Sequence, residues 1–114
     1  MVSIMGIIFY VSHQPGDFVQ LMPITGLDKI MHLVAYGILA AAFLYALHPF
    51  ARSSNHTVIS VMAVIFCVLY GLTDEFHQSF IPGRVVSLLD VVADGLGALL
   101  TVGVWLRRQV KDER

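Results

Sequence analysis

The stretch "YGLTDEFHQSFIPGRVVSLLDVVADG", residues Tyr70 to Gly95, decides the fold class of this chain. It places a dense group of ionisable side chains between two segments that are almost wholly apolar. Pro82 and Gly83 in its middle are strong helix breakers. We therefore interpret the stretch as the end of one helix, a turn and the start of the next helix. Its ionisable residues are Asp74, Glu75, His77, Arg84, Asp90 and Asp94.

The composition of the whole chain indicates an integral membrane protein. Of the 114 residues, 57% are hydrophobic and only 13% are charged, whereas a soluble domain is about 25% charged. The mean hydropathy is +0.77. A small water-soluble domain has too much surface to cover with so few polar groups. The net charge of −1 gives no indication of nucleic-acid binding, so the expected surroundings are a lipid bilayer.

Three segments are long and apolar enough to cross a membrane, which takes roughly 17–25 residues in a helix. They are Ile30 to Leu47, which Pro49 should end, Thr57 to about Thr73, and Val85 to Leu106. A fourth segment, Met1 to Ser12, reaches only about 18 Å as a helix, short of a hydrocarbon core of about 30 Å. The predicted fold is all-α, a bundle of three to four transmembrane helices of which the first is short or truncated.

The orientation follows from the Lys and Arg residues of the connecting segments, because cytoplasmic segments are enriched in them. With four helices, both termini and the 48–56 segment share one side, which carries five basic residues against two on the other. This excess places the C-terminus in the cytoplasm and segments 13–29 and 77–86 on the outward side. The five are Arg52, Arg107, Arg108, Lys111 and Arg114, and the two are Lys29 and Arg84.

Polar residues recur at helical spacing near the outward end of each long helix. Residues three, four, seven or eight positions apart share one helix face, so each helix carries a polar stripe. A charge at the bilayer centre costs about 2.5–3.5 kcal/mol, so these groups should pair or line a wet interior that the helices share. The stripes are Asp28, His32 and Tyr36; Asp74, His77 and Gln78; and Ser87, Asp90 and Asp94.

The glycines, Arg84 and the remaining histidines complete the pattern. Gly95, Gly97 and Gly103 permit close approach of helices in lipid, which favours tight packing and makes an oligomer through this glycine-rich last helix possible. Arg84 either extends its charged head to the lipid headgroups or binds a phosphate or carboxylate through its planar guanidinium. His13, His48 and His56 have no acidic neighbour at helical spacing and are given no role.

These spacings resemble the VanZ-like family of small bacterial membrane proteins. "DKIMHLVAYGIL" at 28–39 and "DEFHQSFIPGRVVSLLDVVADGLG" at 74–97 are similar to the family pattern D-K-x-x-H-x-x-x-Y, then D-E-x-x-Q-x-F-x-P-x-R-x-x-S-x-x-D-x-x-x-N-x-x-G. "YVSHQPG" at 10–16 is similar to the exit of the family's first helix. Asp94 departs from the pattern, because the family usually has Asn there. The matching residues are Asp28, Lys29, His32, Tyr36, Asp74, Glu75, Gln78, Phe80, Pro82, Arg84, Ser87, Asp90 and Gly97.

The resemblance implies a single VanZ-like transmembrane domain over 1–114, with its motif core at 28–97. It also implies a multi-pass protein of the bacterial inner (cytoplasmic) membrane. The founding member of the family is associated with low-level resistance to the glycopeptide teicoplanin, which links the family to antibiotic resistance. The resemblance supplies a fold and a site and specifies no reaction.

The first functional hypothesis is an outward-facing polar pocket that engages an anionic ligand of the cell envelope. A lipid phosphate or a cell-wall glycan precursor has the required charge, and Lys29 and Arg84 would hold it. The carboxyl groups and His77 would position it, with or without a divalent cation. The ligand-binding candidates are Asp28, Lys29, His32, Tyr36, Gln78, Arg84, Ser87 and Asp94.

Two alternatives stay open beside this hypothesis. One is a membrane-embedded hydrolase or transferase, in which Asp74, Glu75, His77 and Asp90 perform acid–base or metal-assisted chemistry. Mixed carboxylate and imidazole ligands suit several metals, and no H-E-x-x-H motif specifies one, so no metal or cofactor is assigned. The side chains that could serve as metal ligands are Asp28, His32, Asp74, His77 and Asp90. The other alternative is structural: the polar groups form a satisfied network that joins three helices in a packing or partner module.

Overall fold

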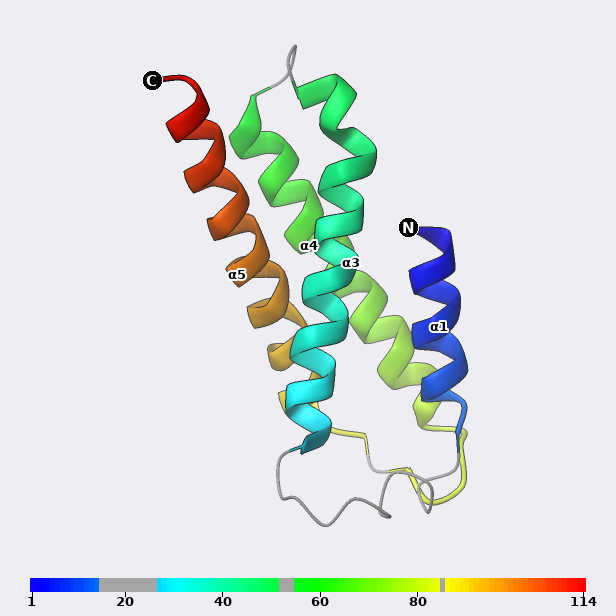
Figure 1. Cartoon of the computed structure of the whole chain (residues 1–114). Coiled ribbons are helices and arrows are strands. Elements are labelled where there is room, and N and C mark those ends of the chain that lie inside the picture. The colour runs from blue at the N-terminus through cyan, green and yellow to red at the C-terminus, as the bar shows by residue number, and fades with distance from the viewer. Residues whose placement is uncertain (15–26, 52–54, 85) are drawn as a thin grey trace.

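The structure, a computed structural model, describes residues 1–14, 27–51, 55–84 and 86–114, with the side chains of 27, 28 and 51 outside the description. It consists of four helices: α1 (Val2–Ser12), α3 (Leu27–Ala51), α4 (His56–Gln78) and α5 (Leu88–Asp112) (Figure 1). Within these ranges there is no β-strand. The predicted all-α helical bundle is therefore confirmed.

Three of the helices are long and apolar enough to cross a membrane. They are Lys29–Phe50, His56–Gln78 and Leu88–Asp112. The chain measures 50 × 24 × 21 Å along its principal axes, comparable with a bilayer of about 40–45 Å including headgroups. Large apolar side chains cover the outside of the bundle, for example Tyr45 and Leu88, which are 84% and 77% exposed. Such a surface suits lipid, and the chain is a multi-pass membrane protein.

The predicted segments end too early, since α4 continues past Thr73 to Gln78 and α5 past Leu106 to Asp112. Two further differences have a local reason. α3 continues through Pro49 to Ala51, because a proline in the last turn removes a single backbone hydrogen bond near the helix end. α5 begins at Leu88, and Val86 and Ser87 before it are not helical, while the predicted start at Val85 lies outside the described residues. The start of α5 is fixed by Ser87, whose hydroxyl accepts a hydrogen bond from the Leu89 N–H at 3.2 Å and so caps the helix.

The first helix is short, as predicted, and covers only part of the bundle. α1 lies against α3 and α4 near the end where α4 finishes, and its N-terminus lies about halfway along the long helices (Figure 1). Few side chains of α1 are buried, and hydrogen bonds to its backbone add to its attachment to the bundle. The Tyr70 hydroxyl donates to the Met5 carbonyl at 2.8 Å. Only Ile8 and Ser12 of α1 are buried.

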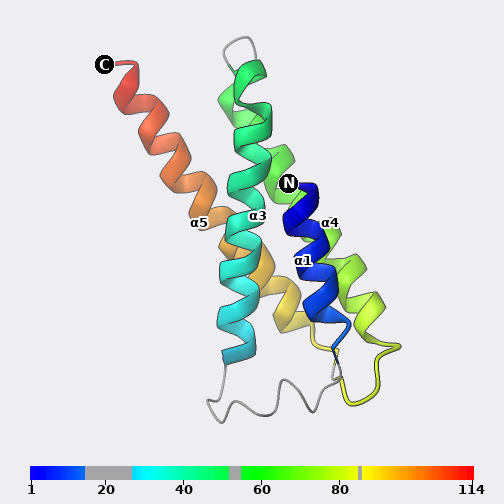
Figure 2. The same cartoon turned by 45° about the vertical axis from the view of Figure 1, so that its right-hand side comes forward.

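The closest helix pair is α3 and α5, which cross and then diverge toward the C-terminus (Figure 2). At the crossing a side chain on Gly97 would overlap the Leu33 carbonyl oxygen. The Thr101 hydroxyl donates to the Gly37 carbonyl at 3.0 Å one turn further along. Gly97 therefore packs closely, as was expected of the glycines. Gly103 does not, because nothing lies within 4 Å of the position that a Cβ on it would take. The buried apolar residues around the crossing are Tyr36, Leu39, Ala40, Cys67 and Ala98.

Candidate functional site

The polar stripes meet at one end of the bundle, as the alternating helix directions require. The C-terminal ends of α1 and α4 and the N-terminal ends of α3 and α5 lie together there (Figure 1). The expectation that this topology gathers the ionisable groups is thus met by the geometry. Asp28, which belongs to the first stripe, lies outside the residues whose side chains the structure describes.

A chain of charged and polar contacts joins α3 to α5. The Lys29 ammonium lies 2.6 Å from Asp90 Oδ1, and His32 Nδ1 lies 2.8 Å from Asp94 Oδ1. The other ring nitrogen, His32 Nε2, faces Asp90 Oδ2 at 3.9 Å, too far for a hydrogen bond. Asp90 and Asp94 are buried. Lys29, which was expected to hold an anionic ligand, is engaged by a carboxylate of the protein itself.

Asp94 has room on the side of α4 because the facing residue there, Gly71, has no side chain. A Cβ on Gly71 would overlap Asp94 Oδ2. Asp94 Oδ2 has no hydrogen-bond partner within the described ranges. Asp94 Oδ1 lies within hydrogen-bond distance of His32 Nδ1. Asp94, which stands where the family pattern has asparagine, therefore contacts the imidazole of His32.

Glu75 links α4 to the start of α5. Its Oε2 accepts a hydrogen bond from the Ser87 N–H at 3.1 Å, whereas Oε1 is buried without a partner in the part of the chain that the structure describes. Ser87 was expected on a ligand-binding stripe with Asp90 and Asp94. Its hydroxyl instead caps α5, so its contribution here is to helix geometry and to holding Glu75.

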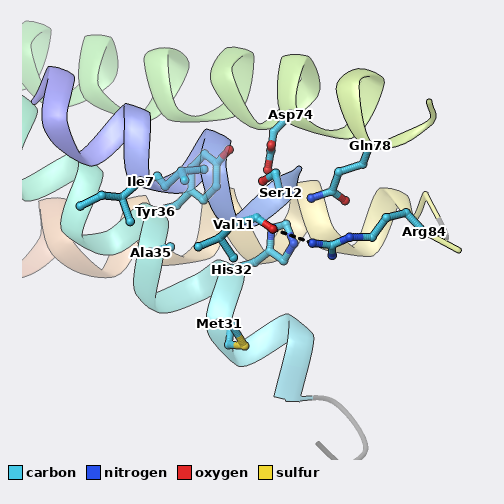
Figure 3. A pocket seen from close by; sticks show the side chains of 11 residues that line it. Ile7, Val11, Ser12, Met31, His32, Ala35, Tyr36, Asp74, Gln78 and Arg84 are labelled. Atoms are coloured by element: carbon cyan, nitrogen blue, oxygen red, sulfur yellow. Dashed lines mark hydrogen bonds between the residues drawn. The ribbon is translucent and has the colours of Figure 1, made fainter. Parts of the chain in front are cut away.

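A cavity of about 170 Å³ lies between α1, α3 and α4 (Figure 3). Toward the bundle end its wall is polar, and deeper in the bundle it is mostly apolar. The Ser12 hydroxyl lies beside the Asp74 carboxylate on the polar side. The buried Tyr36 hydroxyl has no hydrogen-bond partner among the described residues. The lining residues are Ile7, Ile8, Val11, Ser12, Met31, His32, Ala35, Tyr36, Asp74, Gln78 and Arg84.

Arg84 closes the polar end of this cavity and also holds α1. Its Nη2 donates to the Val11 carbonyl at 2.8 Å and its Nε to the Gln14 carbonyl at 2.9 Å. A tight turn positions it: the Arg84 N–H donates to the Ile81 carbonyl at 3.2 Å, and Gly83 has a φ of +77°. Proline followed by glycine at positive φ is typical of a type II turn. Neither predicted role of Arg84 anticipated these contacts with α1.

His77 lies away from the cavity and pairs with a histidine that was given no role. Its Nε2 lies 3.2 Å from His13 Nδ1, and the two rings are stacked with centroids 5.3 Å apart. Phe9 of α1 also stacks on His77, and His13 directly follows the end of that helix. His77 is therefore not among the residues that line the cavity, although it lies one helix turn from Asp74 on α4. The sequence offered no local signal for this pair, because the two histidines are 64 positions apart.

Three residues on three helices bring possible metal ligands together. One ligand atom each of His32, Glu75 and Asp90 lies within 4.8 Å of the other two. Glu75 was not among the metal-ligand candidates chosen from the sequence, whereas Asp74 and His77, which were, are not part of this group. The reason is rotational: Glu75 and Asp74 are adjacent on α4, and only packing decides which carboxyl group faces α5.

Comparison with known proteins agrees with this arrangement of motifs. The family described as VanZ/LLP1 matches residues 1–109. The chain belongs to the VanZ/LLP1 family. A fission yeast (Schizosaccharomyces pombe) protein named "Uncharacterized protein C11E3.10" is similar, at 31% identity over 85 residues, 75% of this chain. The chain spans about half the length of that curated relative. No solved structure matches the chain.

Membership of the VanZ/LLP1 family confirms the resemblance seen in the motifs. Because the similar protein is from a yeast, membership does not by itself assign the chain to a bacterial membrane. What sequence reasoning missed at the site is its apolar half. Ile7, Val11 and Met31 line the cavity, but apolar residues in an apolar helix carry no signal that distinguishes a cavity wall from a lipid-facing surface.

Proposed function

We propose that the cavity binds the headgroup end of an anionic membrane amphiphile, a lipid phosphate or a lipid-carried glycan precursor. The observation that carries this proposal is that one cavity has both a polar end and an apolar wall. Arg84, His32 and Gln78 lie at the polar end, and Ile7 and Ala35 lie on the apolar wall (Figure 3). An amphiphile in a bilayer has the same polarity, with its headgroup at the membrane face and its chain in the hydrocarbon.

The size of the cavity supports a headgroup and not a whole lipid as its content. At about 170 Å³ it is smaller than the roughly 300–1,000 Å³ of pockets that enclose a drug-sized ligand. The hydrocarbon chain of the ligand would therefore lie outside the cavity, against the apolar surface of the bundle. The side chains exposed there, such as Val34 and Ile38 on α3, suit contact with an acyl or polyprenyl chain.

Arg84 is the group at the polar end that supports an anion in particular. Its planar guanidinium carries five N–H donors that match phosphate. Two of these donors contact the carbonyls of Val11 in α1 and of Gln14 just after it, which leaves three for a ligand. His32 also lines the cavity and can donate to an anion when it is protonated. The carboxylate of Asp74 repels an anion, and its neighbour Ser12 offers a hydroxyl to Asp74 or to the ligand.

Native mass spectrometry of the protein purified in mild detergent tests the proposal. We expect about one phosphate-containing lipid per chain, and at least tenfold lower occupancy in an Ala35→Phe variant, whose ring would fill the cavity. The matched control is Ala46→Phe, on the exposed face of the same helix, which should retain the lipid. A wild-type protein without bound lipid, or equal retention by Ala35→Phe, would contradict the proposal.

A second candidate function, hydrolysis or transfer at the bound headgroup, is favoured by one observation. Asp94 holds the ring of His32, which lines the cavity, at 2.8 Å, and a carboxylate-oriented histidine is a common general base. Incubation with phospholipid vesicles should then release phosphate or headgroup in a His32-dependent manner. A lipid that stays chemically unchanged in the wild-type protein would leave binding as the function.

We further propose that this end of the bundle faces away from the cytoplasm and that the C-terminus is cytoplasmic. The support is the excess of basic residues near the other end, among them Arg107 and Lys111. A fluorescent reporter fused after Arg114 should be active only on the cytoplasmic side. A reporter active on the opposite side would reverse the assignment.

A further inference from the structure

The donor atoms of His32, Glu75 and Asp90 converge from α3, α4 and α5 onto one small volume. Because they all lie within 4.8 Å of one another, some point is no more than about 2.8 Å from each. Metal–ligand bonds to nitrogen and oxygen are about 2.0–2.6 Å long. A shift of at most about 0.8 Å, within reach of side-chain rotation, would therefore place all three donor atoms around one ion.

The orientation of His32 supports such an ion. Its Nδ1 lies 2.8 Å from Asp94 Oδ1, and a carboxylate that accepts the Nδ1 proton directs the lone pair of Nε2 outward, as in carboxylate–histidine–metal groups. Nε2 faces Asp90 Oδ2 at 3.9 Å. Two ligands of one ion are separated by about 3–4 Å when each bond is about 2.1 Å long, whereas a hydrogen bond needs a shorter distance.

The charge around this volume points the same way. Glu75, Asp90 and Asp94 bring three buried carboxyl groups, and Lys29 pairs with one oxygen of Asp90. Glu75 is only 5% exposed, and its Oε1 has no partner within the described residues. A buried carboxylate oxygen without a hydrogen bond is costly. A cation shared with Asp90 and His32 would remove that cost.

We propose that His32, Glu75 and Asp90 bind one divalent transition-metal ion, with Asp94 as a positioning residue that orients His32. One imidazole and two carboxylates suit Zn²⁺, Mn²⁺ or Fe²⁺ better than Mg²⁺ or Ca²⁺, which prefer oxygen ligands alone. This inference rests on the proposed function and deepens it. Since His32 also lines the cavity, the ion would supply positive charge beside an anionic headgroup where Lys29 is already engaged.

Metal titration of the full chain in mild detergent, after removal of metal with a chelator, tests the proposal. We expect one Zn²⁺ or Mn²⁺ per chain by calorimetry and native mass, with Mg²⁺ at least tenfold weaker. Glu75→Gln, which can still accept from Ser87, His32→Gln and Asp90→Asn should each weaken binding at least tenfold. The control is the double variant His56→Gln, Glu113→Gln, which removes a histidine–glutamate pair 3.8 Å apart at the opposite end.

Positioning by Asp94 has its own readout. Asp94→Asn should weaken metal binding by less than Glu75→Gln does, and it should change the visible absorption of bound Co²⁺, because the imidazole ligand is reoriented. If the ligand variants do not fold, the Co²⁺ spectrum of the wild-type protein decides the matter. Bands typical of a nitrogen and oxygen ligand set of low coordination support the site, and the spectrum of hydrated Co²⁺ overturns it.

The outcomes separate this inference from the proposed function. Retained lipid without stoichiometric metal binding overturns the cation site and leaves the proposed function intact. Stoichiometric metal that depends on Glu75 and His32, in a protein that retains no lipid, supports the cation site and contradicts the proposed function. Metal bound equally by wild type and by all three ligand variants overturns the site.

Discussion

Replacing Gly97 by alanine should separate the closest helix pair of the bundle. The added Cβ would overlap the Leu33 carbonyl oxygen, a backbone atom that cannot rotate away, so α3 and α5 must move apart. Overpacking of this kind costs about 1–3 kcal/mol, and alanine returns up to about 1 kcal/mol through its higher helix propensity. The movement would also stretch the 3.0 Å hydrogen bond from Thr101 to Gly37.

We expect the Gly97→Ala variant to have a free energy of unfolding up to about 2 kcal/mol below wild type, once the gain in helix propensity is subtracted from the packing cost. Unfolding by SDS in mixed micelles, followed through the fluorescence of Trp105, measures it. The matched control is Gly103→Ala in the same helix, where nothing lies within 4 Å of the new Cβ, so its stability should equal or exceed that of wild type. Equal stability of the two variants would refute the close contact on which the reasoning depends.

Three further predictions concern single contacts. Gly71→Ala should displace the Asp94 carboxylate and cost about 1 kcal/mol of stability, measured by the same SDS unfolding. Unchanged stability would contradict the contact between Gly71 and Asp94. Arg84→Gln should free the C-terminal end of α1, so we expect hydrogen exchange at least tenfold faster in α1 than in wild type, with unchanged exchange in α5. Thr101→Val should cost about 0.6 kcal/mol by loss of one interhelical hydrogen bond; stability equal to wild type would contradict that hydrogen bond.

Much of the architecture follows from two regularities of the sequence. Apolar length gives the three spans, and the alternation of helix direction brings the polar ends of α3, α4 and α5 to one face. The predicted end of α3 at Pro49 was wrong because a proline near a helix end costs little. The prediction that Val86 and Ser87 belong to the last helix was wrong because Ser87, treated as part of a helical stripe, acts as the cap.

The contacts inside the site could not be predicted in the same way. Helical spacing states which residues share a face but not how far one helix is rotated relative to the next. This is why the sequence did not indicate that Arg84 donates to the carbonyls of Val11 and Gln14 at the C-terminal end of α1. For the same reason His77 was grouped with Asp74 although it contacts His13. Sequence separations of 64 to 73 residues carry no local signal for these partners.

The pairing of α3 with α5 has a consequence for the biogenesis of the protein. Lys29 and His32 are synthesised and delivered to the membrane about sixty residues before their partners Asp90 and Asp94. The last helix therefore supplies the two carboxylates that contact the polar end of α3. Ribosomes stalled before α5 emerges should hold an intermediate in which this polar end of α3 is more accessible to solvent than in the finished bundle.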